Sequence, residues 1–178
     1  MRLPWPDGPH VVPQGTPGAV TIVGRLYDGA GNVIPDGLIE TWQAGPDGRF
    51  AHPDDPRGAV PGGYHGFRGF GRCPTAPDGS YRIVTLKPGP LPAPDGSIEA
   101  PHLDVSVFAR GLLDRCVTRM YFPGDPLLPL DPIFNSVPDE KARQRLIARF
   151  DIELTQPEWA LGYEWDIVLR GRDATVFE

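Results

Sequence analysis

The feature that most constrains the fold is a series of short segments in which apolar and polar side chains alternate. Alternation with a period of two residues is typical of a β-strand with one buried face. The chain has 22 glycines and 23 prolines among 178 residues, and these gather between the alternating segments, where turns are expected. The segments are 19–27, 38–44, 80–86, 102–108, 116–122 and 163–169, with a shorter one at 175–177. Six or seven such strands predict an all-β fold, an antiparallel β-sandwich.

One short helix is predicted near residues 137–149. Ser136 can cap its start and Pro138 suits its first turn, so we interpret the helix as support for the sandwich. Two long irregular stretches, 49–75 and 87–101, separate the strands. Loops of this length in a compact domain usually carry function or form an interface.

The pattern divides the chain into an irregular N-terminal arm, residues 1–17, and a β-sandwich domain, residues 18–178. Because 40% of the residues are hydrophobic and 10% are aromatic, the many glycines and prolines do not indicate disorder. Trp5 and the pair Val11 and Val12 give the arm apolar groups. These groups pack either on the chain's own domain or on another subunit.

Charge and cysteine content exclude several classes of protein. The net charge is -6 and no run of Lys or Arg occurs, which disfavours binding to nucleic acid or to an anionic membrane. No apolar stretch approaches the ~20 residues that span a bilayer, and the first residues lack the apolar core of a signal peptide. Cys73 and Cys116 form no zinc motif. We therefore expect a cytoplasmic protein with reduced thiols.

The segment beginning at His102 is the clearest candidate site. On a strand His102 and Asp104 point to the same face, so an imidazole and a carboxylate lie side by side. One interpretation is a buried polar pair, in which His102 hydrogen-bonds Asp104 or a loop group. The other is a metal site completed by Tyr64 and His65.

Several short motifs follow one another in a specific order along the chain. They are V-G-R-L-Y-D at 23–28, E-T-W-Q-A at 40–44, D-G-S-Y at 78–81, K-P-G-P at 87–90, M-Y-F-P-G-D at 120–125 and Y-E-W-D-I-V-L-R-G at 163–171. In this order and spacing the chain resembles the intradiol ring-cleavage dioxygenases, from about residue 19 to its end. The resemblance implies a β-sandwich fold, in agreement with the strand pattern.

The resemblance also implies where a metal would bind. Members of the family hold a non-haem Fe(III) with two tyrosinates and two histidines. The positions that match these four ligands are occupied here by Phe50, Leu91, His102 and Asp104, and Glu99 stands where an arginine is usual. Because Phe50 and Leu91 have no donor atom, the sequence predicts that this chain binds no iron.

The strand at 100–111, A-P-H-L-D-V-S-V-F-A-R-G, resembles one branch of the family. That branch combines α and β chains of the same fold, and only the β chain holds Fe(III). The resemblance implies that this is an α chain with no catalytic residue, inactive alone. The resemblance further implies that such a chain pairs with a β subunit to cleave protocatechuate with dioxygen to 3-carboxy-cis,cis-muconate in aromatic catabolism. Arg110 is then a substrate-binding residue, because a guanidinium suits the ring carboxylate of protocatechuate; a surface role is the alternative.

Two other functions stay open at this stage. The first is a stand-alone β-sandwich module that serves in binding or as a scaffold. The second is a single-chain dioxygenase with altered ligands, against which Phe50 and Leu91 argue. It has no phosphate-binding Gly-Lys-Ser/Thr loop, no Gly-x-Ser-x-Gly elbow and no Cys-His nucleophile pattern, which excludes a self-contained kinase or hydrolase.

Overall fold

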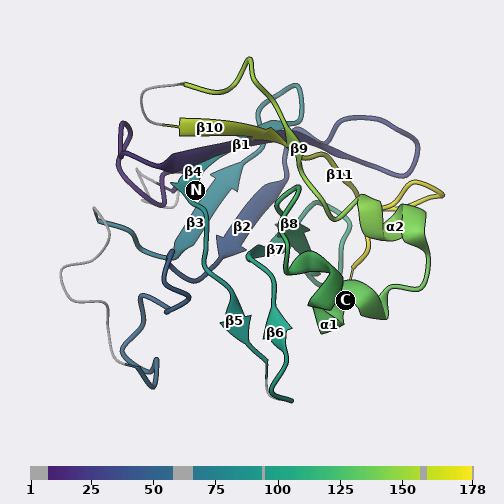
Figure 1. Cartoon of the computed structure of the whole chain (residues 1–178). Coiled ribbons are helices and arrows are strands. Elements are labelled where there is room, and N and C mark those ends of the chain that lie inside the picture. Colours follow the sequence, from purple (N-terminus) through teal and green to yellow (C-terminus); the bar gives the residue numbers. More distant parts are fainter. Residues whose placement is uncertain (1–7, 58–65, 94, 157–159, 178) are drawn as a thin grey trace.

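Two β-sheets pack face to face, with a small hairpin and short helices gathered at one end (Figure 1). The computed structural model describes residues 8–57, 66–93, 95–156 and 160–177. The predicted all-β sandwich is confirmed. Most strand pairs are antiparallel, but β1 runs parallel to β10 and β11.

The first sheet is built around the long strand β1, which pairs with β4 on one side and with β10 and β11 on the other. Its strands are β1 (Ala19–Tyr27), β4 (Ser80–Leu86), β9 (Arg149–Phe150), β10 (Ala160–Glu164) and β11 (Ile167–Val168). The predicted strand 163–169 is therefore interrupted at Trp165 and Asp166, between β10 and β11.

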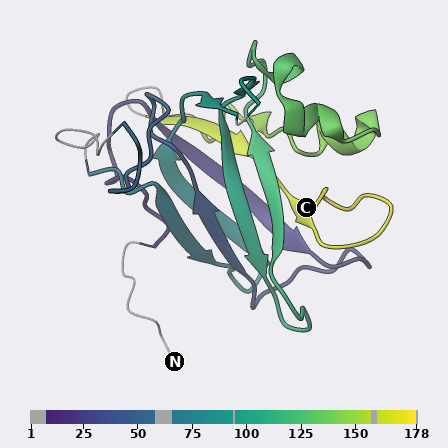
Figure 2. The same ribbon diagram turned by 90° about the horizontal axis from the view of Figure 1, so that it is seen from below.

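The second sheet has the order β3-β2-β7-β8, and the hairpin β5-β6 lies near one of its ends (Figures 1 and 2). Its strands are β2 (Leu38–Trp42), β3 (Phe70–Pro74), β7 (His102–Phe108) and β8 (Cys116–Tyr121), and the hairpin strands are β5 (Leu91–Pro92) and β6 (Ile98–Glu99). The predictions missed β3, β5, β6 and β9, which are short or lie within the stretches interpreted as irregular. Residues 175–177 form no strand.

The core lies between the sheets and is built from the alternate residues that face inward. Fully buried side chains from both sheets include Ile22, Leu26, Ile39, Ile83, Leu103, Val107 and Met120. Each such side chain stabilises the fold by about 1.5–3 kcal/mol relative to an exposed one. On the opposite face of the second sheet, the partly exposed side chains of Trp42, Asp104 and Arg119 are direct cross-strand neighbours, because β7 pairs Asp104 with both.

The helical region differs from the single predicted helix. It contains the 3-10 turn η1 (Leu128–Leu130) and two short helices, α1 (Pro132–Ser136) and α2 (Glu140–Gln144). Ser136 ends α1 instead of capping the next helix, and Asp139 caps α2. The break falls at Val137, which is extended because a residue before proline is disfavoured in the helical region.

The described part of the N-terminal arm packs on the chain's own domain. Val11 and Val12 are buried in the core, and the Val11 amide donates to the carbonyl oxygen of Val84 on β4 at 2.8 Å. Trp5 lies outside the described residues. No helix of the described residues is long and apolar enough to cross a membrane, and Cys73 and Cys116 are free thiols.

Candidate functional site

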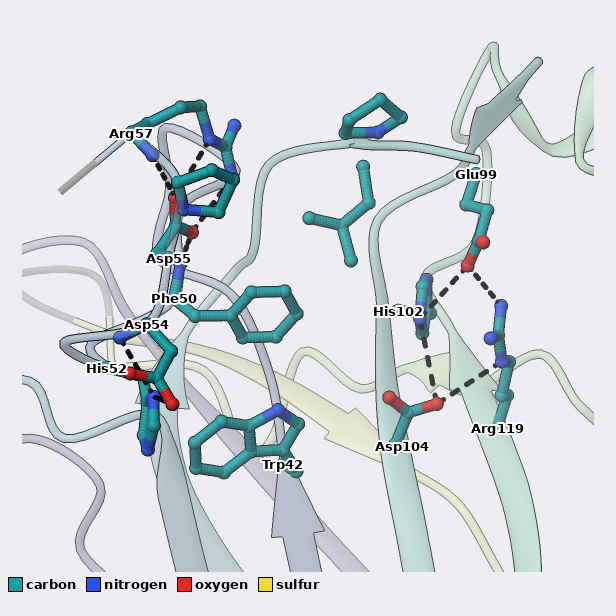
Figure 3. A pocket seen from close by; sticks show the side chains of 13 residues that line it. Trp42, Phe50, His52, Asp54, Asp55, Arg57, Glu99, His102, Asp104 and Arg119 are labelled. Carbon is teal, nitrogen blue, oxygen red and sulfur yellow. Dashed lines mark hydrogen bonds and ion pairs between the residues drawn. The ribbon is translucent and has the colours of Figure 1, made fainter. Parts of the chain in front are cut away.

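A cavity of about 600 Å³ opens at the end of the second sheet where β7 begins (Figure 3). Strands β2, β7 and β8, the hairpin β5-β6 and the loop at 50–57 contribute to its wall. Its lining consists of Trp42, Phe50, His52, Asp54, Asp55, Pro56, Arg57, Leu91, Pro92, Glu99, His102, Asp104 and Arg119. All four positions that match the family's iron ligands, Phe50, Leu91, His102 and Asp104, therefore lie at one cavity.

Two glycines bring the loops of this cavity together. Gly48 has φ +74, and a Cβ there would lie 2.4 Å from the carbonyl oxygen of Pro90. At Gly89 a Cβ would lie 2.5 Å from a carbonyl oxygen of the opposing loop. Both positions therefore require glycine, and the close backbone packing places Phe50 and Leu91 at the same cavity.

Aromatic rings form one side of the cavity. The rings of Trp42 and Phe50 are stacked, with centroids 5.7 Å apart and planes inclined by 10°, and the ring of His52 meets Trp42 edge-on at 6.3 Å. Figure 3 shows these rings facing the polar residues of β7 and β8 across the cavity. This side offers an apolar, π-rich surface and no metal ligand at position 50.

Asp55 holds the loop that carries Phe50. Its carboxylate accepts hydrogen bonds from the amides of Phe50 (2.8 Å) and Arg57 (2.9 Å) and from the Arg57 guanidinium (3.1 Å). The hydrogen bond from the Arg57 side chain, followed by those from the two amides, holds the pKa of Asp55 well below its ordinary value. Arg57 also donates to the Gly48 carbonyl oxygen at 2.5 Å, so its charge is engaged within the loop.

His102 is buried at the start of β7, and the orientation of its ring is fixed by the backbone. Its Nδ1 lies 2.7 Å from the carbonyl oxygen of Ala100, and since a carbonyl only accepts, Nδ1 carries the proton. Its Nε2 faces Glu99 and Asp104, each 3.7 Å away. Of the two partners expected for a buried His102, Asp104 or a loop group, the hydrogen bond goes to the backbone of Ala100, and Asp104 stays 3.7 Å away.

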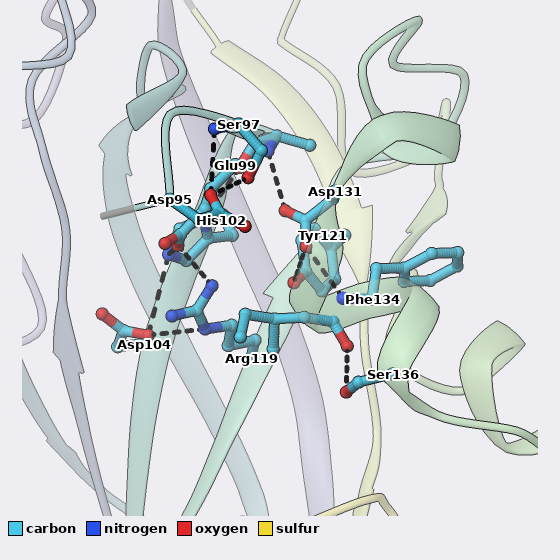
Figure 4. Close-up of polar contacts among 12 residues, drawn as sticks. Asp95, Ser97, Glu99, His102, Asp104, Arg119, Tyr121, Asp131, Phe134 and Ser136 are labelled. Carbon is cyan, nitrogen blue, oxygen red and sulfur yellow. Dashed lines mark hydrogen bonds and ion pairs between the residues drawn. The ribbon is translucent and has the colours of Figure 1, made fainter. Parts of the chain in front are cut away.

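Arg119 on β8 lies between the two carboxylates of this wall (Figure 4). Its Nη1 donates to Glu99 at 2.5 Å, and its Nε lies 3.2 Å from Asp104 Oδ1. Burial opposes the charge of Arg119, but Asp104 and Glu99 outweigh it and raise the pKa of the guanidinium above its ordinary value. The permanently charged guanidinium of Arg119 therefore balances the charges of Glu99 and Asp104 at this cavity.

Asp131 fixes the backbone that leads into β7. This fully buried residue accepts hydrogen bonds from the amides of Ala100 and Phe134, each at 2.8 Å, and from the Tyr121 hydroxyl at 3.2 Å. Burial, together with the Asp131 charge, raises the pKa of Tyr121. Asp131, the N-cap of α1, is thus hydrogen-bonded to Ala100, whose carbonyl oxygen orients the ring of His102 (Figure 4).

The residues at this cavity do not fit a ferric ion held by tyrosinates. Phe50 and Leu91 have no donor atom, and Arg119 supplies the positive charge between the carboxylates. Within the described ranges, no group of three or more His, Cys, Asp or Glu side chains is arranged to hold a metal ion. Tyr64 and His65, the other members of the alternative metal site, lie outside these ranges.

Arg110 lies just beyond the other end of β7, at the β7-β8 turn. The strand from His102 to Phe108 is roughly 20 Å long, so Arg110 lies too far away to line the cavity of its own chain. Its side chain is 85% exposed and pairs with Asp36 at 3.2 Å. Arg110 therefore does not line the cavity of its own chain, and its substrate role stays a prediction.

Comparisons with known proteins agree with the sequence motifs. A family model described as Dioxygenase matches residues 8–171. The chain is 45% identical over 161 residues to the protocatechuate 3,4-dioxygenase β chain of Burkholderia cepacia, covering 89% of this chain and 67% of that one. It is 38% identical over 181 residues to the α chain of the same organism, covering 99% and 80%.

Solved structures share the same fold. The dioxygenase domain of a dioxygenase carbohydrate-binding protein fusion from Streptomyces sp. SirexAA-E superposes with a TM-score of 0.65 at 25% identity, over 96% of each chain. Catechol 1,2-dioxygenase from Acinetobacter sp. ADP1 superposes with the same score at 19% identity, over 89% of this chain and 55% of that one. The family resemblance drawn from the motifs is thus confirmed, and the chain belongs to the dioxygenase family.

Proposed function

We propose that the chain is the α subunit of a protocatechuate 3,4-dioxygenase and that it binds no iron itself. Overall identity does not separate the two chain types: a β chain is the more identical relative, whereas the α chain matches a larger share of this chain. The assignment rests on the cavity at the start of β7. Phe50 and Leu91 replace both tyrosine ligands there, and Arg119 occupies the space between Glu99 and Asp104.

The catalytic Fe(III) is then supplied by a partner β subunit. Relatives named as separate α and β chains support an assembly of two chain types. In that assembly protocatechuate and dioxygen react at the partner's iron to give 3-carboxy-cis,cis-muconate. This chain contributes structure and Arg110, whose exposed guanidinium at the β7-β8 turn can reach a neighbouring chain. We place this reaction in the cytoplasm.

Iron analysis of the chain alone and of the complex tests this proposal. Co-expression with a β-type chain that carries Gly-Arg-Tyr and His-x-His motifs is expected to yield a complex with ferric iron. The chain alone is expected to hold none. Stoichiometric ferric iron with a tyrosinate charge-transfer band in the isolated chain contradicts the assignment. Failure to form any complex with β-type chains favours a stand-alone binding module instead.

A further inference from the structure

The charged donors at the cavity at the start of β7 are paired within the chain, whereas one of its carboxylates keeps an oxygen open within the described part of the chain. Its two guanidiniums are already engaged, Arg57 by Asp55 and Arg119 by Glu99 and Asp104. On the acceptor side, Asp104 binds Arg119 through Oδ1, and no contact of its Oδ2 is found among the described residues. This oxygen can accept a hydrogen bond from a ligand that donates one.

His102 adds an acceptor that is aimed into the same space. Only 4% of the surface of this residue is exposed, and it lines the cavity. Because Nδ1 carries the proton toward Ala100, Nε2 presents its lone pair. Among the residues that the structure describes, Nε2 makes no hydrogen bond and has only the two carboxylates at 3.7 Å.

The charge of the lining also favours a cation. Four carboxylates (Asp54, Asp55, Glu99 and Asp104) and two guanidiniums (Arg57 and Arg119) give the lining a net charge of -2 when both imidazoles are neutral. The aromatic side acts in the same direction, because the faces of Trp and Phe attract a cation. Trp42 is the direct cross-strand neighbour of Asp104, so their Cβ atoms lie about 5 Å apart.

We propose that this metal-free cavity binds a small organic monocation, an aryl-alkyl primary amine in its ammonium form. The ammonium donates to Asp104 Oδ2 and His102 Nε2, within reach of the Trp42 face. The aryl group packs on the stacked rings of Trp42 and Phe50, with Leu91 and Pro92 also lining the space. Binding is independent of the partner's iron and of Arg110, at the other end of β7, so this site is separate from the proposed catalytic function.

Calorimetric titration of the full chain with three compounds of matched shape tests the proposal. The probes are 2-phenylethylammonium, neutral 2-phenylethanol and anionic 3-phenylpropionate. The cation is expected to bind about tenfold more tightly than the alcohol, as charge-assisted hydrogen bonds are stronger than neutral ones, and the anion is expected to bind most weakly. No binding of the cation at millimolar concentration, or equal binding of the anion, overturns it.

Two substitutions locate the site. Asp104→Asn, which removes the charge beside Arg119, and Trp42→Ala, which removes the aromatic face, are each expected to weaken binding of the cation about tenfold. Asp173→Asn is the matched control, because it removes one carboxylate that is 78% exposed and does not line the cavity. Equal weakening by Asp173→Asn indicates a nonspecific charge effect and rejects the site. The ligand series on the unmodified chain stays decisive if a variant fails to fold.

Discussion

The two ends of strand β7 differ in how their charged side chains are satisfied. At the His102 end, Arg119 pairs with both Glu99 and Asp104, and Asp131 fixes the backbone that precedes the strand. At the other end, Arg110 is 85% exposed and its only described partner, Asp36, is itself 43% exposed. Leu113, in the same turn, is fully exposed.

This difference separates two roles of the same strand. Groups that satisfy one another inside a chain stabilise that chain, and removing one leaves the others buried and unpaired. A pair that is mostly in water contributes little to folding. We therefore expect the charged groups at the His102 end to contribute to the stability of this chain as well as to line its cavity, whereas Arg110 contributes little to stability and acts on other molecules.

The largest loss of stability is expected for Asp131→Ala. The substitution leaves the buried amides of Ala100 and Phe134 without their acceptor and removes the N-cap of α1. We expect the free energy of unfolding in urea to fall by about 3 kcal/mol. Asp139→Ala is the control, because that residue caps the exposed helix α2 and its loss should cost about 1 kcal/mol. Equal losses contradict a special role for Asp131.

Arg119→Met is expected to have the next largest effect. It leaves the carboxylates of Glu99 and Asp104 near each other without the cation that pairs with both. Because Asp104 is partly exposed to water, the resulting loss of stability is limited. We expect a loss of roughly 2 kcal/mol in the free energy of unfolding. Adding Glu99→Gln should restore part of it, which a double-mutant cycle measures. A double variant no more stable than Arg119→Met shows that charge balance is not the cause.

A smaller and local effect is expected when Asp55 is protonated. Because the pKa of Asp55 is lower in the folded chain than its ordinary 3.8, its contribution is present above pH 3.8 and is lost as the pH falls below that value. The Phe50 amide, which donates to Asp55, should then exchange its hydrogen faster relative to the remaining loops. In the Asp55→Asn variant, lowering the pH should not accelerate hydrogen exchange of the Phe50 amide relative to the remaining loops. If the acceleration persists in this variant, another carboxyl group causes it.

The fold could be predicted from the sequence because the alternating pattern reports burial directly. Segments 19–27, 80–86 and 102–108 match strands β1, β4 and β7 residue for residue. The short strands β5 and β9 could not be found, because two residues carry no period. The sequence does carry a signal for α1 in Asp131-Pro132, an N-cap followed by proline at N1, but Ser136 and Pro138 present a second, competing signal for a helix start.

The site was only partly accessible to the same reasoning. The motifs single out Phe50, Leu91, His102 and Asp104 as matching the ligand positions, and in the structure these four line one cavity. Arg119 was missed because its importance depends on the register of β8 against β7, which places it opposite Asp104. Strand register is a pairing between distant segments, and no local pattern in 116–122 reveals it.

The smallest effect on stability, and the clearest test of the comparison between the two ends, is expected for Arg110→Ala. Its exposed pair with Asp36 should change the free energy of unfolding by less than about 0.5 kcal/mol. In the complex with a β subunit, the KM for protocatechuate should rise about tenfold, because a charge-assisted hydrogen bond to the ring carboxylate is lost. The KM for catechol, which has no carboxylate, should hardly change. Arg115→Ala, an exposed arginine just before β8, is the control for a general change in charge. Equal losses with both substrates, or a clearly less stable chain, place Arg110 in a structural role like that of the His102 end.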